Sequence, residues 1–144
     1  MDYVAENAAA RERVLGLARG LSDEALSRPV GDDWTIGAEL AHLAFWDRVH
    51  VGRLRAAIDQ GHTVPPPLPD GLTDIINNGE LGTWRRLPGR DAIDIFEAAS
   101  RDVDEYVATL DPVIVEGVRA AGMSRLVERF RHRLEHADEI ERSL

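Results

Sequence analysis

The chain is organised around residues 130–140, which read Phe130-Arg131-His132-Arg133-Leu134-Glu135-His136-Ala137-Asp138-Glu139-Ile140. This run contains no Gly or Pro, and its two histidines are four residues apart. On a helix, positions i and i+4 lie one above the other on the same face. Two imidazoles placed in this way can share one metal ion, because their ring nitrogens can converge on a point beside the helix. We therefore expect a helix here that presents His132 and His136 together.

Three other stretches carry the same kind of amphipathic pattern. Apolar residues recur at helical spacing over about residues 3–20, 36–60 and 91–110, and the pattern around the histidine pair extends over about residues 123–142. Thr35 is suitably placed to be the N-cap of the second stretch. Four amphipathic helices with almost no strand pattern predict an all-α protein, a four-helix bundle formed by a single domain over residues 1–144.

Two connecting segments have weaker patterns. Residues 72–87 are expected to form a long excursion with one or two helical turns at most, because Gly79 and Gly82 interrupt the pattern. Residues 113–115 are Val-Ile-Val, which is strand-like but too short to form a sheet alone, so we expect an apolar loop there. Long excursions between helices are often functional.

The composition excludes several classes of function. The 144 residues carry a formal net charge of -9, which disfavours binding to nucleic acid or to anionic lipid. No apolar run is long enough to span a membrane. The chain has no cysteine, so disulfides and thiolate metal sites are excluded, and any catalytic thiol must come from another molecule. The N-terminus lacks a secretory pattern, and we expect a cytoplasmic protein.

A third histidine, His42, lies within the expected helix 36–60 at the border of its apolar stripe, in one row with Trp46. His132 and His136 lie at the same kind of border, so all three are expected to face a cleft between helices. Three imidazoles suit a first-row divalent ion such as zinc or nickel and leave a position open for water or substrate. Glu135 or Glu139 can then accept a hydrogen bond from a ring N–H or act as a base, and their spacing alone does not choose between them.

Simpler interpretations of these histidines stay open at this point. An HxxxH pair arises by chance on charged helices, and Arg131, Arg133 and the acidic residues around them can equally form an ion-paired face in solvent. The histidines can also be packed without any metal, in a purely structural bundle. His50 and His62 are interpreted as solvated or structural. The chain contains no glycine-rich phosphate loop, no GxSxG and no HExxH motif.

A family resemblance adds to this interpretation. Residues 34–47 read Trp34-Thr35-Ile36-Gly37-Ala38-Glu39-Leu40-Ala41-His42-Leu43-Ala44-Phe45-Trp46-Asp47. They resemble the signature of the DinB/YfiT-like superfamily, in which a W-[TS] pair starts the second helix and an H-L-x-x-W-[DE] element follows. The pair His132-x-x-x-His136 resembles the second motif of that family, on its last helix. The resemblance covers nearly the whole chain and implies an up-down-down-up four-helix bundle with a divalent metal held by His42, His132 and His136.

The resemblance also implies a class of activity. Relatives include the metal-binding domain of mycothiol-dependent maleylpyruvate isomerase, which suggests a metal-dependent S-transferase, isomerase or hydrolase that uses a low-molecular-weight thiol such as mycothiol or bacillithiol. This chain lacks the additional C-terminal domain of that isomerase, so the isomerase activity itself is not expected. The alternative is a non-catalytic protein that binds a small molecule or protects against stress with the same cleft. Many relatives are dimers, which suggests a homodimer.

Several further residues are candidates for binding the thiol or the substrate. They are Trp46, beside His42, and the polar groups Asn77, Asn78, Arg85 and Arg86 of the excursion. The excursion residues are expected to line the entrance of the cleft and to bind a carboxylate of the small molecule.

Overall fold

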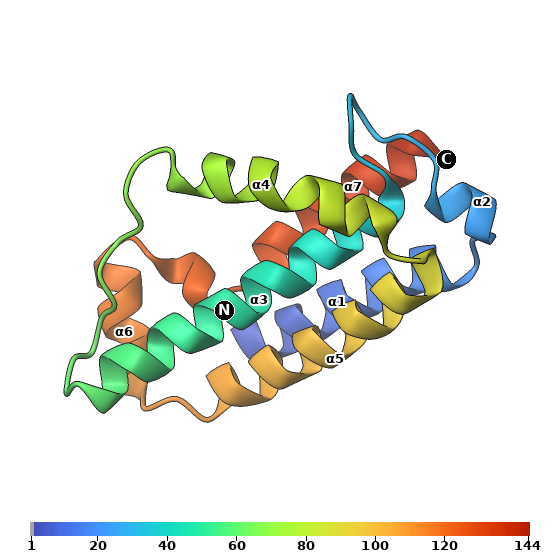
Figure 1. Ribbon diagram of the computed structural model, residues 1–144. Coiled ribbons are helices and arrows are strands. Elements are labelled where there is room, and N and C mark those ends of the chain that lie inside the picture. Colours follow the sequence, from blue (N-terminus) through green and yellow to red (C-terminus); the bar gives the residue numbers. More distant parts are fainter. Residues whose placement is uncertain (1) are drawn as a thin grey trace.

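The computed structural model describes residues 2–144. Within this range the regular structure is helical, apart from one isolated bridge between Pro29 and Thr35. The helices are α1 (Tyr3–Arg19), α2 (Asp23–Leu26), α3 (Ile36–Asp59), α4 (Leu72–Arg86), α5 (Gly89–Ala108), α6 (Pro112–Ala120), the 3-10 helix η1 (Ser124–Leu126) and α7 (Phe130–Ser143) (Figure 1). The all-α prediction is confirmed.

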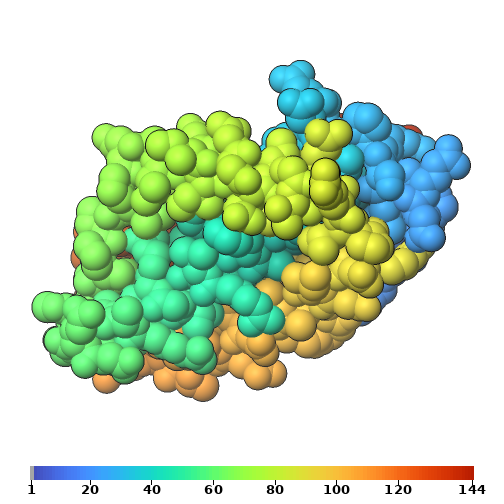
Figure 2. All heavy atoms as spheres, in the orientation of Figure 1, coloured from blue at the N-terminus to red at the C-terminus, as the bar shows by residue number. Residues whose placement is uncertain are grey.

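Helices α1, α3, α5 and α7 pack against one another. Helix α3 packs against α5 and α7, and α1 packs against the same two helices, so the four enclose a common interior. Leu15, Leu40, Phe96 and Ile140, one from each helix, are buried together in this core. Helix α4 lies across α3 on the outside of this group (Figures 1 and 2).

Capping sets the register of α3, the helix that carries His42. The Thr35 hydroxyl accepts a hydrogen bond from the backbone N–H of Ala38 at 3.0 Å, as the sequence predicted. At the other end Gly61, at φ 79°, follows the last turn and lets the chain reverse. With this register, one face of α3 buries Glu39, His42 and Asp47.

The expectation of an irregular excursion over residues 72–87 is wrong, because residues 72–86 form the continuous helix α4. Gly79 and Gly82 do not break it, and each has open space where a side chain would be. The helix is held by tertiary packing, since Trp84 is buried against Ala38 and Ala41 of α3. Packing of this kind commonly overrides weak intrinsic propensity.

Two boundaries near the C-terminus also differ from expectation. Residues 113–115 are not a loop but part of α6, because the Asp111 carboxylate accepts from Val113 N–H and Pro112 occupies the first turn. The last helix begins at Phe130 and not near residue 123. The buried Asn7 side chain explains this start: its amide donates to the Val127 carbonyl at 2.8 Å and accepts from Phe130 N–H at 2.8 Å.

Among the described residues, no helix is both long enough and apolar enough to cross a membrane.

Candidate metal centre

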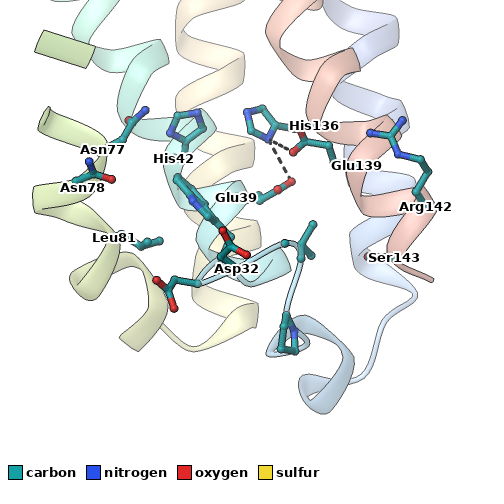
Figure 3. Close-up of a pocket in the computed structure, with 15 residues that line it drawn as sticks. Asp32, Glu39, His42, Asn77, Asn78, Leu81, His136, Glu139, Arg142 and Ser143 are labelled. Carbon is teal, nitrogen blue, oxygen red and sulfur yellow. Dashed lines mark hydrogen bonds and ion pairs between the residues drawn. The ribbon is translucent and has the colours of Figure 1, made fainter. Parts of the chain in front are cut away.

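The structure brings the three predicted histidines together. His42 comes from α3, while His132 and His136 come from successive turns of α7. The Nε2 atoms of His42 and His132 lie 2.9 Å apart, and those of His132 and His136 lie 3.2 Å apart. Figure 3 shows His42 and His136 facing each other from α3 and α7. One nitrogen of each ring therefore converges on a single point between the two helices.

Burial keeps two of these imidazoles, those of His42 and His132, neutral. His42 is only 5% exposed, and burial, followed by the nearby His136, lowers its pKa to about 3. Burial and then the positive charge of Arg129 hold the pKa of His132 well below its usual range. The indole rings of Trp34 and Trp84 pack edge-on against His42, at 5.2 and 5.4 Å between ring centroids. Neutral imidazole is the form that binds metal, so the site needs no proton loss from these two rings at neutral pH.

Glu39 is a site residue that the sequence analysis missed. Its carboxylate Oε2 lies 3.2 Å from His136 Nδ1, and Glu39 is 3% exposed. Burial raises the pKa of Glu39 to about 7, although its contact with His136 opposes that rise. A carboxylate on Nδ1 orients the ring and leaves Nε2 free to bind metal. The sequence does contain a signal for this role, because Glu39 lies three residues before His42 and so shares its helical face.

The structure separates the two glutamates that the sequence could not distinguish. Glu139 Oε2 lies 3.3 Å from His136 Nδ1, at the edge of the site, with 43% of its side chain exposed. Glu135 instead pairs with Arg125 at 2.5 Å, and about half of its side chain is exposed. Of the two, Glu139 is therefore the one in reach of a histidine of the cluster.

His132 is held by a buried ion network that the sequence analysis also missed. Arg129 Nη2 lies 3.3 Å from His132 Nδ1, and Arg129 Nε donates to Asp47 Oδ1 at 2.8 Å. The other oxygen of Asp47 accepts from Arg133 at 3.1 Å, and Arg133 continues to Asp104 at 2.9 Å. Arg133 is fully buried, so its suggested place on a solvent-exposed face is wrong. Asp47 thus joins α3 to the segment that carries His132.

Two cavities meet at the histidine cluster. The larger, which we call the cleft, has a volume of about 970 Å³ and contains His42, Trp34, Glu39, His136 and Glu139 in its wall. The smaller has a volume of about 270 Å³ and lies against His42 and His132. His42 belongs to both, and within residues 2–144 its Nδ1 is buried without a hydrogen-bond partner.

The other predicted binding residues are divided by this arrangement. Asn78 lines the cleft, Trp46 lines the smaller cavity, and Asn77 lines both. The Trp46 indole N–H donates to Asn77 Oδ1 at 2.8 Å, which ties α3 to α4. Arg85 and Arg86 are exposed and line neither cavity, so the structure does not bring them to the histidines.

The residues present fit a divalent metal ion. His42, His132 and His136 offer three nitrogen donors within 4.8 Å of one another, a donor set suited to zinc or nickel. Glu39, His136 and Glu139 form a second group within the same distance, with two carboxylates in place of two imidazoles. That group uses Nδ1 of His136, whereas the three histidines converge through Nε2, and Glu39 already occupies Nδ1.

The comparison with protein families agrees with this site. The chain matches the DinB superfamily over residues 6–139 and belongs to it. This superfamily is in general metal-binding, and the described residues contain a buried histidine and glutamate group that can hold a metal. No curated protein and no solved structure gave a match to the chain.

Replacing Glu39 by glutamine is expected to lower zinc affinity about 10- to 100-fold, the range for loss of a partner that orients a metal-binding histidine. The reason is that glutamine keeps the size of the side chain but removes the charge beside His136 Nδ1. Glu139→Gln is the matched control, because in this variant Nδ1 of His136 loses only a half-exposed partner. Competition with a chromophoric chelator measures both affinities. Equal losses in the two variants would show that Glu39 has no special part in orienting His136.

Proposed function

We propose that this protein is a metal-dependent thiol S-transferase, of the mycothiol or bacillithiol type, that acts on an electrophilic small molecule. The observation that carries the proposal is the convergence of three histidine nitrogens at the wall of a cleft of about 970 Å³. Such a volume is at the upper end of the range for small-molecule sites, roughly 300–1,000 Å³. A thiol and a second small molecule therefore have room beside the histidines.

Each residue of the site has a defined part in this function. His42, His132 and His136 would hold the divalent ion, zinc or nickel. When bound, such an ion lowers the pKa of a thiol and holds it as the thiolate. Glu39 would keep the proton of His136 on Nδ1, and Glu139, which lines the cleft, would accept the proton that the thiol releases. Trp34 and Trp84 shield the His42 side of the cluster from water.

The same proposal includes the finer points of the fold. The contacts of α3 and α1 with both α5 and α7 support an up-down-down-up four-helix bundle. A homodimer and a cytoplasmic location, where low-molecular-weight thiols are abundant, remain predictions that accompany this function.

A second function uses the same cleft without turnover. The protein would then bind or sequester a small molecule, for instance in protection against stress. The size of the cleft and its mixed lining, with Leu81 and Trp34 beside Asp32, Asp33 and Asn78, favour this alternative, because apolar and polar contacts together can hold a small molecule without a reaction.

Metal analysis and turnover assays separate these possibilities. We expect the purified protein to contain about one divalent ion per chain, and we expect chelation to lower its melting temperature, since a ligand at 100 times its Kd adds about 2.7 kcal/mol of stability. The zinc- and nickel-loaded forms are then assayed with mycothiol, bacillithiol or glutathione and a panel of electrophiles. Thiol consumption that requires metal supports the transferase. Metal binding without turnover supports the binding protein, and a protein that binds no metal contradicts the transferase.

A further inference from the structure

The smaller cavity beside the histidines is basic, in a protein whose formal net charge is -9. We call it the arginine pocket. It is lined by His42, Trp46, His50, Leu68, Thr73, Asn77, Arg125, Arg129, His132 and Glu135. Two guanidinium groups thus face one carboxylate. The cleft on the other side of His42 has the opposite character, with four carboxylates, Asp32, Asp33, Glu39 and Glu139, and one guanidinium, Arg142.

Arg129 gives the arginine pocket a buried cation with donors to spare. It is 1% exposed. Its Nε donates to Asp47, its Nη1 donates to the Arg125 carbonyl at 2.7 Å, and its Nη2 lies against His132. A guanidinium group has five N–H donors, so about two of them remain for another acceptor.

Arg129 is the last member of the buried ion network, and the end of the network at Arg129 has too little negative charge. Asp47 divides its two oxygens between Arg129 and Arg133, and Asp104 pairs with both Arg133 and Arg11. Guanidinium and carboxylate groups therefore alternate along the network, and it has a guanidinium at each end. At one end Arg11 also reaches the exposed Glu12, at 3.5 Å. At the other end Arg129 meets the arginine pocket, where an anion would supply the missing charge.

We propose that the arginine pocket binds the carboxylate group of a small anionic ligand, with Arg129 and Arg125 as its donors. Thr73 and Asn77 add polar groups to the same wall. This carboxylate site deepens the proposed function, and it rests on that function only for the identity of the ligand. In that case the carboxylate of the thiol or substrate is anchored on one side of His42, and its reacting end lies at the histidine cluster. Arg129 and Arg125 then have the role that the sequence suggested for Arg85 and Arg86.

Glu135 already occupies part of this site. Its carboxylate pairs with both terminal nitrogens of Arg125, at 2.5 and 3.3 Å, in a bidentate arrangement. Both side chains are about half exposed, so this pair contributes little and exchanges readily. A ligand carboxylate would replace Glu135 on Arg125, and Glu135 is therefore an internal competitor.

The three tryptophans provide a test in the metal-free protein. Trp46 lines the arginine pocket, Trp34 lines the cleft, and Trp84 is buried and lines neither. In protein labelled with 5-fluorotryptophan and treated with chelator, we expect acetate, at constant ionic strength against chloride, to shift the Trp46 fluorine resonance saturably with a roughly millimolar Kd. The Trp34 and Trp84 resonances should stay in place. Shifts of equal size at all three tryptophans, or none at Trp46, would overturn the proposal.

Two variants with opposite expected effects sharpen this test without touching the buried Arg129. Arg125→Gln should weaken acetate binding about fivefold, because one charged donor is lost. Glu135→Gln should tighten it by about twofold or more, because the competing carboxylate is gone, and a damaged fold would not do this. Arg142→Gln, in the cleft, is the control for general charge and should change nothing. Equal weakening by Arg125→Gln and Arg142→Gln would contradict the site. Since the titration uses no metal, its failure leaves the metal-binding proposal standing, and failure of metal binding leaves this result standing.

Discussion

Replacing His42 by alanine is expected to lower zinc affinity by more than about 100-fold. Loss of a partner that only orients a ligand costs up to roughly that factor, and His42 would be a ligand itself. Its Nε2 lies 2.9 Å from that of His132, so the substitution removes one of the three converging nitrogens. Affinity is measured by competition with a chromophoric chelator, and metal content by elemental analysis.

His62→Ala is the matched control for this experiment, because His62 is exposed and lies outside both cavities. It should bind zinc as the unmodified protein does. If His42→Ala and His62→Ala retain the same affinity, zinc binds elsewhere or the histidines are packed without a metal. The structural-bundle interpretation would then be correct.

Replacing Asp47 by alanine is expected to reduce the free energy of unfolding by about 3–5 kcal/mol, the range for breaking a buried ion pair from one side. Asp47 is 1% exposed and is the carboxylate that Arg129 and Arg133 share. Its loss leaves the Arg129 guanidinium buried beside a histidine instead of a carboxylate. Urea unfolding of the metal-free protein, followed by circular dichroism, measures the change.

The control is Asp102→Ala, which removes one partner of the exposed Arg48–Asp102 pair at 3.2 Å. An exposed pair contributes less than about 1 kcal/mol. Asp47→Ala should also weaken zinc binding, because the network holds Arg129 against His132, whereas Asp102→Ala should not. Similar unfolding free energies for the two variants would mean that the network does not join α3 to α7 as the contacts indicate.

The parts of this structure that the sequence predicted are those with local causes. Thr35 caps α3 through its own hydroxyl, and the helical pattern after it places His42 on a buried face. The i, i+4 spacing of His132 and His136 places both on one side of α7. The prediction that these two elements meet rested on the place of all three histidines at the borders of their apolar stripes, and the family resemblance strengthened it.

The parts that the sequence did not predict depend on tertiary contacts. Helix α4 is interrupted by two glycines in sequence, and it forms because Trp84 packs on α3. Arg133 looks like a surface residue beside other charges, but two carboxylates from α3 and α5 meet it in the interior. Glu39 lies among apolar residues, and the apolar pattern of this stretch does not indicate which partner the carboxylate has. Long-range charge pairing leaves no periodic signal in one sequence.

The central claim is that His42, His132 and His136 hold one divalent ion, and an anomalous-difference map from crystals of the zinc-loaded protein tests it most directly. We expect one peak with the three Nε2 atoms about 2.0–2.1 Å from it, the distance of a zinc–imidazole bond. A peak between the carboxylates of Glu39 and Glu139 instead, or no peak at the histidines in protein that holds zinc, would contradict it.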